Sequence, residues 1–300
     1  MKKYIGIDLG GTNVRVAVVT EDGEVLSQLK CPSYAKEGRE KVLDNLFSLI
    51  HQLPNWQECS GIGAGVPGPC DQKSGAMMLD TNLPGFAGFP FAKALSDEFG
   101  MPAYIDNDAN VAGLAEALLG AGKGKDVVYF VTISTGIGGG LIVNGKTVSG
   151  RHGFAGEIAN IIIDRNREKV NYLAVGAVEN EASGTAISRK AKAALPDIEL
   201  RHAGSLFELA AAGNEKAQEI ADGVEMDLAQ LFATLAAAVD PDIFVLSGGV
   251  MNSADYFLEA MIEKFKSITH TALHDTEFVR AILEEPGIVG AAMLPKSHGN

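Results

Sequence analysis

Two segments of this chain repeat the same order of structural signals, and this repetition constrains the fold more than any other feature. In the first, an apolar run ends at Asp8, the turn Gly10-Gly11-Thr12 follows, and residues 14–19 form a β-branched run. In the second, residues 127–133 are apolar, residues 134–140 form a glycine-rich loop, and residues 141–145 are apolar again. A strand, a glycine turn and a returning strand at both places indicate an internal duplication, with each copy facing the same cleft.

The rest of the chain alternates helical and strand patterns, which favours layered α/β domains. Because 300 residues exceed the roughly 150 expected of one domain, we expect two domains, at residues 1–119 and 120–300. The last helix can pack back on the first domain. The remaining expected elements are helices at 37–52, 184–194, 205–212, 215–239, 254–267 and 287–294, and strands at 62–66, 243–246 and 279–283.

Charge and cysteine content narrow the classes of function. A formal net charge of −13 and the lack of a basic cluster argue against a nucleic-acid partner. Three cysteines without a CxxC spacing fit free thiols in a reducing compartment. No run of about 18 apolar residues and no signal-peptide pattern occurs, so we expect a cytoplasmic protein without a membrane partner.

The glycine turns indicate phosphate binding, because glycines let main-chain N–H groups approach an anion without a Cβ in the way. Neither turn is a Walker A motif or a dinucleotide fingerprint, since no Gly-Lys-Ser/Thr follows and no helix begins there. Asp8, at the end of the first strand, is placed to hold Mg²⁺ through water. The predicted nucleotide-binding residues are Asp8, Gly10, Gly11, Thr12, Asn13, Thr135, Gly136, Gly138, Gly248 and Gly249.

Asp108 lies where a strand passes into a helix. A lone aspartate there can be an N-cap and nothing more. The neighbouring Asp106, Asn107 and Asn110 exceed what one cap requires. The positive end of the helix should keep Asp108 ionised, ready to accept a hydroxyl proton during phosphoryl transfer.

Together the motifs resemble the ROK family. They are Asp8-Leu9-Gly10-Gly11-Thr12, Asp106-Asn107-Asp108-Ala109-Asn110, Ser134-Thr135-Gly136-Ile137-Gly138-Gly139-Gly140, Ala155-Gly156-Glu157-Ile158 and Leu246-Ser247-Gly248-Gly249. The resemblance implies an α/β protein of the actin/hexokinase-like fold, with duplicated ribonuclease H-like domains and an interdomain cleft. It also implies an enzyme that phosphorylates a hexose with ATP and Mg²⁺, most simply glucose to glucose 6-phosphate, and a homodimer.

The resemblance also assigns roles in the predicted site. It makes Asp108 the catalytic base. Amide and carboxylate groups suit a polyol substrate, because they hydrogen-bond its hydroxyls. The residues that it assigns to sugar binding are Asn82, Asn107, Glu157, Asn160 and Glu179.

One departure from the family pattern concerns a metal. Many members carry a zinc site made by a histidine and a Cys-x-Cys-Gly-x-x-Gly-Cys run. Here Asn160 stands at the histidine position, and residues 171–178 contain no cysteine. A zinc site needs about four nitrogen or sulfur ligands, so we expect no zinc. The missing histidine also leaves the choice of sugar open.

Three alternatives remain from the sequence. The substrate can be another sugar, such as N-acetylmannosamine, N-acetylglucosamine, fructose, mannose, allose or a β-glucoside. The family also includes sugar-sensing regulators without catalysis, but these carry an N-terminal helix-turn-helix, whereas here the phosphate-loop strand begins at Tyr4. An actin-like ATPase would explain the glycine turns but not Glu157 and Glu179.

Overall fold

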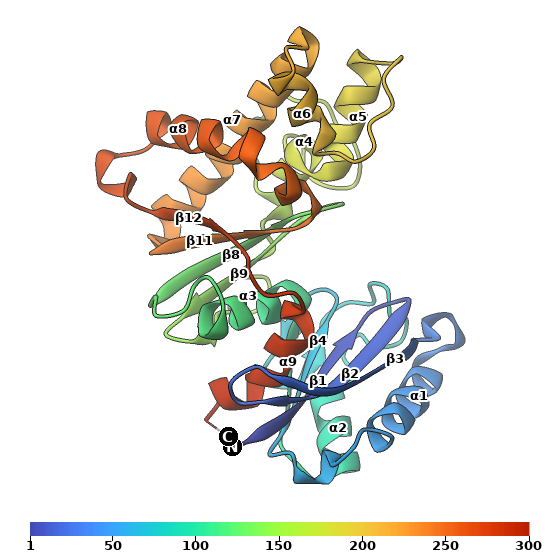
Figure 1. Ribbon diagram of the computed structural model, residues 1–300. Helices are drawn as coiled ribbons and strands as arrows, with labels where there is room; N and C mark the ends of the chain where they lie inside the picture. Colours follow the sequence, from blue (N-terminus) through green and yellow to red (C-terminus); the bar gives the residue numbers. More distant parts are fainter. Residues whose placement is uncertain (300) are drawn as a thin grey trace. The chain divides into compact units, whose positions relative to one another are not determined.

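The computed structural model describes residues 1–299, which form two compact units (Figure 1). The first unit comprises Met1–Phe130, Gly140–Gly156 and the C-terminal residues from Ala281 onward. The second comprises Val131–Gly139 and Glu157–Arg280. The chain therefore leaves the first unit and returns to it, and its last helix belongs to the first unit.

The first unit contains a five-stranded sheet of order β3-β2-β1-β4-β7. β1, β2 and β3 form an antiparallel meander, and β4 and β7 continue the sheet parallel to β1. The register aligns Asp8 with Gly65 and Gly65 with Asp106, so the carboxyl ends of three parallel strands meet at one edge. The strands are β1 (Lys3–Leu9), β2 (Asn13–Thr20), β3 (Val25–Pro32), β4 (Ile62–Val66) and β7 (Ala103–Asn107).

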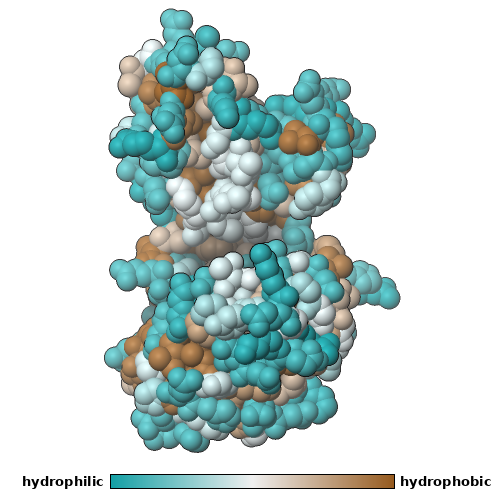
Figure 2. All heavy atoms as spheres, turned by 90° about the vertical axis from the view of Figure 1, so that its right-hand side faces the viewer, coloured by the Kyte–Doolittle hydropathy of each residue, from teal (hydrophilic) through white to brown (hydrophobic). Residues whose placement is uncertain are grey.

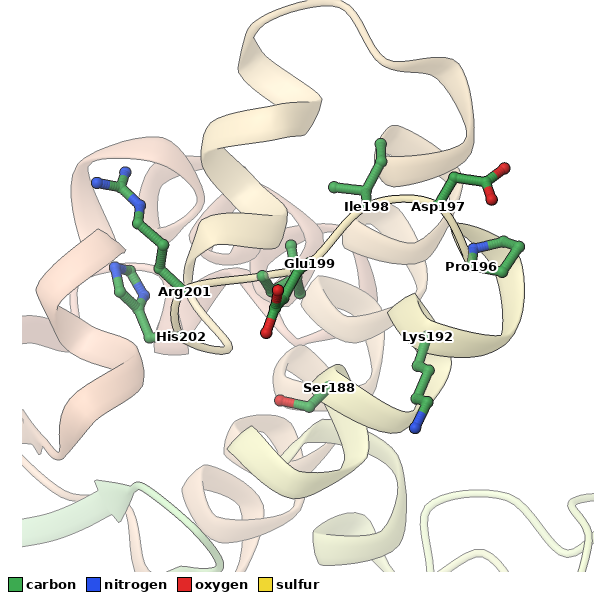
Figure 3. Close-up of a pocket in the computed structure, with 9 residues that line it drawn as sticks. Ser188, Lys192, Pro196, Asp197, Ile198, Glu199, Arg201 and His202 are labelled. Carbon is green, nitrogen blue, oxygen red and sulfur yellow. The ribbon is translucent and has the colours of Figure 1, made fainter.

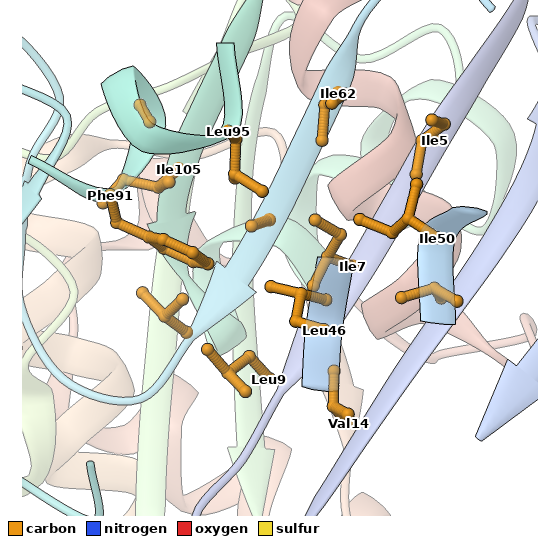
Figure 4. Close-up of a cluster of buried hydrophobic side chains, with 14 of the residues drawn as sticks. Ile5, Ile7, Leu9, Val14, Leu46, Ile50, Ile62, Phe91, Leu95 and Ile105 are labelled. Carbon is orange, nitrogen blue, oxygen red and sulfur yellow. The ribbon is translucent and has the colours of Figure 1, made fainter. Parts of the chain in front are cut away.

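Alternating residues of β1 and β4 face two different helical layers. One set packs with α1 (Arg39–His51) and α2 (Phe91–Phe99) in an apolar core (Figure 4). On the other face, Gly6 of β1 and Gly63 of β4 lie directly against α9 (Pro286–Ser297): a Cβ on Gly63 would come within 1.8 Å of the Ala291 carbonyl oxygen. The Ile-Gly-Ala-Gly-Val sequence of β4 thus reflects a bulky layer on one face and close helix packing on the other.

Helix α3 (Asp108–Leu119) follows β7 directly and packs against α9. Gly290 permits this contact, because a Cβ there would come within 1.7 Å of the Val111 carbonyl oxygen. The first unit also contains a short antiparallel hairpin of β5 (Cys70–Asp71) and β6 (Ala76–Met77), which is separate from the five-stranded sheets.

The second sheet has the order β10-β9-β8-β11-β12. Counted from the start of each half, both sheets have the order 3-2-1-4-5, and in both the fourth and fifth strands are parallel. This shared topology confirms the predicted duplicated α/β fold. The strands are β8 (Val127–Ile133), β9 (Ile137–Val143), β10 (Lys146–Thr147), β11 (Ile243–Ser247) and β12 (Glu277–Arg280).

The glycine loop expected at residues 134–140 is shorter than predicted. β9 begins at Ile137, so Gly138, Gly139 and Gly140 belong to a strand, and the turn closes with Ser134 N donating to Gly136 O at 2.8 Å. Glycines weaken a strand, but Gly140 lies against Asn110 of α3, where a Cβ would come within 3.0 Å of the Asn110 Cα. Close packing against α3 explains that glycine.

Most other residues of the second unit are helical. The longest helix, α7, spans the predicted range, begins at an Asn214 cap and ends at Asp240 in the left-handed conformation. The helices of this unit are α4 (Val178–Ala182), α5 (Gly184–Ala194), α6 (Ser205–Ala211), α7 (Glu215–Val239) and α8 (Leu258–Ile268).

On the face drawn in Figure 2, hydrophilic residues cover much of each unit and apolar residues gather in small patches. Among residues 1–299, no helix is both long enough and apolar enough to span a bilayer.

Candidate active site

Asp108 is the first residue of α3, but it is not the residue that caps this helix. The N-cap is Asn107, whose side-chain oxygen accepts from Ala109 N at 2.8 Å and Asn110 N at 3.4 Å. Asp108 accepts from Ala109 N at 2.8 Å, and the residue is exposed. The alternative that Asp108 serves only as the N-cap of the helix is therefore wrong, because Asn107 is the N-cap.

The surroundings of Asp108 shift its pKa in the direction opposite to the one expected from the helix end alone. Reduced solvation raises the pKa of the carboxyl, the Ala109 N–H opposes this, and the negative charge of Asp8 raises the pKa further. The pKa of Asp108 therefore lies above the ordinary value for aspartate, although the carboxyl remains accessible to solvent. A carboxylate of raised pKa is a stronger proton acceptor.

Asp106 has no accessible surface and organises the residues around Asp108. Its carboxylate accepts from Gln72 Nε2 at 2.5 Å and Asn110 Nδ2 at 2.8 Å. It also accepts from Asn107 N at 2.7 Å and from Ser149 Oγ at 3.3 Å. These neutral donors satisfy the buried carboxylate and tie the β5–β6 hairpin and α3 to the end of β7.

The first glycine turn lies beside Asn82. Gly10 N donates to Asn13 O at 2.9 Å, which closes the turn. A Cβ on Gly11 would come within 2.6 Å of the Asn82 Cβ, so only glycine allows this approach. Gly11, Thr12 and Asn82 line a cavity of about 440 Å³, to which Lys36 contributes the cation. The fold thus brings two predicted phosphate-loop residues next to a predicted sugar ligand.

Asp8, the predicted ligand for hydrated Mg²⁺, is paired with Arg15. Arg15 Nε donates to Asp8 Oδ2 at 2.9 Å and its Nη2 donates to the same oxygen at 2.5 Å, while Nη1 contacts Glu285. Asp8 and Arg15 are direct cross-strand partners in the hairpin. Sequence reasoning missed Arg15, because a turn at residues 10–12 would pair Asp8 with Val14, whereas the structure pairs Leu9 with Val14 and Asp8 with Arg15.

A single carboxylate such as Asp8 is sufficient as a protein ligand for Mg²⁺, because in phosphoryl transfer this ion is coordinated by one or two carboxylates together with water and the substrate phosphates. Asp8 lies near enough to Asp108 to shift its pKa, so a divalent cation there would face two negative groups. Within residues 1–299, no cluster of three or more histidine, cysteine or acidic side chains could hold a metal by itself.

In the second unit, Glu179 contacts the second glycine turn. Its Oε2 accepts from Ile137 N at 2.9 Å, and a Cβ on Gly136 would come within 2.4 Å of that oxygen. A glycine at position 136 is therefore required for the contact with Glu179, independently of the predicted role of this turn in phosphate binding. Glu179, predicted as a sugar ligand, is held by a main-chain group of the turn.

Gly248 closes the end of β11 against β8. Its φ of +97° and the 2.3 Å that would separate a Cβ from the Ile133 carbonyl oxygen both demand glycine. A cavity of about 500 Å³ opens beside it. Its lining includes the predicted residues Thr135 and Gly249, the first turn of α5, His202 and Asn252.

A larger cavity of about 610 Å³ adjoins this one and shares Ser188 and His202 with it (Figure 3). It lies between α5 and the segment 196–202, with Lys192 and Arg201 among its lining residues. None of the predicted site residues lines it.

Glu157 and Asn160 lie at the start of an irregular segment. Glu157 is exposed, and Asn160 Oδ1 accepts from Ala174 N at 2.8 Å. The carbonyl end of the Asn160 amide is therefore committed to the segment's own backbone. The three cysteines belong to the first unit, and Cys59 and Cys70 are buried.

Two five-stranded sheets of equal topology, with glycine turns and a helix-start carboxylate, define a protein of the actin/hexokinase-like class. The chain belongs to the ROK family, whose model matches residues 4–298. The resemblance inferred from the motifs is thereby confirmed.

The chain is similar to known sugar kinases along nearly its whole length. A glucokinase of Thermotoga maritima is 30% identical over 308 residues, covering 98% of this chain and 97% of that protein. An N-acetylmannosamine kinase of Escherichia coli is 30% identical over 290 residues, covering 97% of each. The crystal structure of a ROK hexokinase from Thermus thermophilus has a TM-score of 0.84 at 32% identity, covering 99% of this chain and 100% of that one.

Proposed function

We propose that this protein transfers the γ-phosphoryl group of ATP to a hydroxyl of a hexose, with glucose as the first candidate and glucose 6-phosphate as its product. The observation that carries the proposal is the state of Asp108. Its carboxylate is exposed and has a raised pKa, and it does not cap the helix, because Asn107 is the N-cap. Membership of the ROK family and the similarity to glucokinases support the reaction class.

In the proposed reaction, the hexose oxygen forms a bond to the γ-phosphorus and the bond from that phosphorus to the bridging oxygen breaks. ADP leaves with the electron pair, and Asp108 takes the proton of the attacking hydroxyl. Asp8 would hold Mg²⁺ through water, and the bound ion would supply charge neutralisation at the phosphate oxygens. Asp106 keeps the end of β7 fixed, so that Asp108 meets the hydroxyl in one orientation.

For the nucleotide, we propose the 500 Å³ cavity of the second unit. Its wall includes Gly184 and Thr185 of the first turn and Ser188 of the second turn of the eleven-residue helix α5. The N–H groups of Gly184 and Thr185 donate to Ser134 O and Thr135 O, so the attraction for an anion comes from the positive end of the helix dipole. This arrangement supplies positive potential in a chain whose formal net charge is −13.

For the sugar, we propose the residues assigned by resemblance, which are Asn82, Asn107, Glu157, Asn160 and Glu179. The side-chain oxygens of Asn107, Asn160 and Glu179 already accept hydrogen bonds from main-chain N–H groups. Asn107 Nδ2 also donates to Gly68 O at 3.2 Å, so binding of a sugar hydroxyl by Asn107 would use the second N–H of its amide. An N-acetylated hexose is the main competitor of glucose, since N-acetylmannosamine kinases are equally similar to the chain.

A coupled assay for ADP tests the proposal, with glucose, mannose, fructose, allose, N-acetylmannosamine, N-acetylglucosamine and a β-glucoside offered separately. We expect ADP release to depend on one of these sugars, with kcat/KM for it at least about 10-fold above the others, because a site that hydrogen-bonds hydroxyls discriminates epimers. Equal, sugar-independent ATP hydrolysis, or none with any sugar, would contradict the proposal.

A further inference from the structure

The segment between Glu157 and Glu179 contains little regular structure, although it joins two of the proposed sugar ligands. Apart from a single 3-10 turn at Ile158–Asn160, neither helix nor strand occurs before α4 begins at Val178. Its base is closed by two main-chain bonds, from Ile163 N to Gly176 O and from Val178 N to Ile161 O, each 2.9 Å. Contacts that hold the rest of the segment in place therefore also help to position the Glu157 and Glu179 carboxylates at its two ends.

Arg167 provides the main attachment of the segment's outer part. Its Nε donates to Asp164 Oδ2 at 2.8 Å within the segment. Its Nη1 donates to Glu181 Oε2 at 3.2 Å on α4, and its Nη2 donates to Asp227 Oδ1 at 2.8 Å on α7. One guanidinium therefore joins three carboxylates on three different elements, a geometry that a lysine ammonium cannot reproduce.

Two of these carboxylates are buried, which makes the attachment specific. Only 1% of the Asp227 side chain and 6% of the Glu181 side chain are exposed. Lys190 of α5 is the second cation, 3.3 Å from Asp227 Oδ2 and 3.0 Å from Glu181 Oε2. Buried carboxylates need such partners, and loss of one cation leaves an underpaired charge in the protein interior.

Helix α4 transmits this attachment to the proposed site. Five residues are too few for a helix to be stable by its own hydrogen bonds, so α4 depends on its surroundings. Three successive residues provide them: Glu179 accepts from Ile137 N, Asn180 donates to Asn171 Oδ1 at 2.9 Å, and Glu181 meets Arg167. The same short helix is held by the glycine turn, by the segment and by the buried ion cluster.

We infer that Arg167 is a positioning residue that sets sugar affinity: by holding residues 161–176 and α4 on the buried carboxylates Glu181 and Asp227, it fixes Glu157 and Glu179 for the sugar. This inference rests on the proposed function for its kinetic part. Its structural part, the anchoring of residues 158–182, stands on the contacts alone.

The test compares wild type, Arg167→Ala and Arg167→Lys, with Arg165→Ala as the matched control. Arg165 is an exposed arginine in the same segment. In Arg167→Ala we expect KM for the sugar to rise roughly 10-fold or more and KM for ATP to stay within about 2-fold, because a displacement of about 1 Å in a binding group has effects of this size. The sugar KM of Arg167→Lys should lie between those of wild type and Arg167→Ala. Guanidinium chloride at millimolar concentration should lower the sugar KM of Arg167→Ala, whereas sodium chloride at the same concentration should not.

Hydrogen exchange on the same variants separates the two parts. We expect faster exchange in Arg167→Ala at residues 158–182 and unchanged exchange in α8. Unchanged exchange at 158–182 would overturn the anchoring, and faster exchange with an unchanged sugar KM would overturn the positioning role. If Arg167→Ala does not fold, the lysine variant decides by the same criteria. A wild-type enzyme inactive on every sugar would defeat the proposed function, while exchange would still decide the anchoring.

Discussion

Arg15 donates two hydrogen bonds to one oxygen of Asp8, so the carboxylate proposed to hold hydrated Mg²⁺ is paired with a cation of the protein. The two residues face each other across the first hairpin, and about 29% of each side chain is exposed. A cation at this position competes with Mg²⁺ for the same oxygen.

Replacing Arg15 with glutamine should therefore lower the Mg²⁺ concentration that gives half-maximal activity. An ion pair of this exposure contributes up to about 1 kcal/mol, which corresponds to a shift of about 2- to 5-fold. The measurement is a magnesium titration at saturating sugar and fixed ATP. Lys123→Gln, an exposed cation in the same unit, should leave the titration unchanged. A higher magnesium requirement in Arg15→Gln would contradict the competition.

The raised pKa of Asp108 predicts the acid limb of the pH–rate profile. Only the ionised carboxylate accepts a proton, so activity falls as pH falls through the pKa of Asp108, at a higher pH than for an ordinary aspartate. The negative charge of Asp8 contributes to that shift. Asp8→Asn should therefore move the midpoint of the limb in kcat/KM to lower pH, even as the overall rate drops. A limb unmoved in Asp8→Asn would show that another group controls it.

Glu116 should be among the most important polar residues for stability, although it takes no part in the proposed chemistry. Its side chain is fully buried, and it accepts from Ile282 N at 3.0 Å, Leu283 N at 2.9 Å and Ala121 N at 2.8 Å. Glu116→Ala leaves three N–H groups without this partner, each worth about 1–3 kcal/mol, so we expect a loss of about 3 kcal/mol or more in the free energy of unfolding.

Urea unfolding measures this loss. Glu116→Gln keeps one acceptor oxygen and should lose less than Glu116→Ala. The exposed Glu219 is the control, for which Glu219→Ala should change stability by less than about 0.5 kcal/mol. A loss below about 1 kcal/mol in Glu116→Ala would mean that water replaces the carboxylate at those groups.

Much of the fold could be predicted from local sequence. Helix α7 was predictable to the residue, because 25 positions of helical periodicity begin at an asparagine cap. Helix α2 was not predicted, since nine residues after Pro90 carry too short a pattern and no capping side chain. The start of β9 was misplaced because three successive glycines predict a loop, and local propensity does not contain the contact with α3 that explains Gly140.

Some features of the candidate site could likewise be predicted from local sequence, whereas others depend on tertiary packing. The sequence locates Asp108 at the start of a helix, but it cannot decide between Asn107 and Asp108 as the cap, because the two residue types rank alike there. The attachment of Arg167 to Asp227 joins residues 60 positions apart. Such a contact depends on how α7 packs, and no local pattern reveals it.

The most direct measurement is kcat for Asp108→Asn with the best sugar. The amide keeps the size of the carboxylate but cannot take the proton, so kcat should fall about 10²- to 10⁴-fold, with sugar and ATP binding nearly unchanged. Because the pKa of Asp108 is raised in the folded protein, its ionised form lowers stability at neutral pH, and this contribution disappears as pH falls through that pKa. Asp108→Asn should therefore melt at the wild-type temperature or above it at neutral pH. Wild-type kcat in a stable Asp108→Asn variant would contradict the assignment of Asp108 as the base.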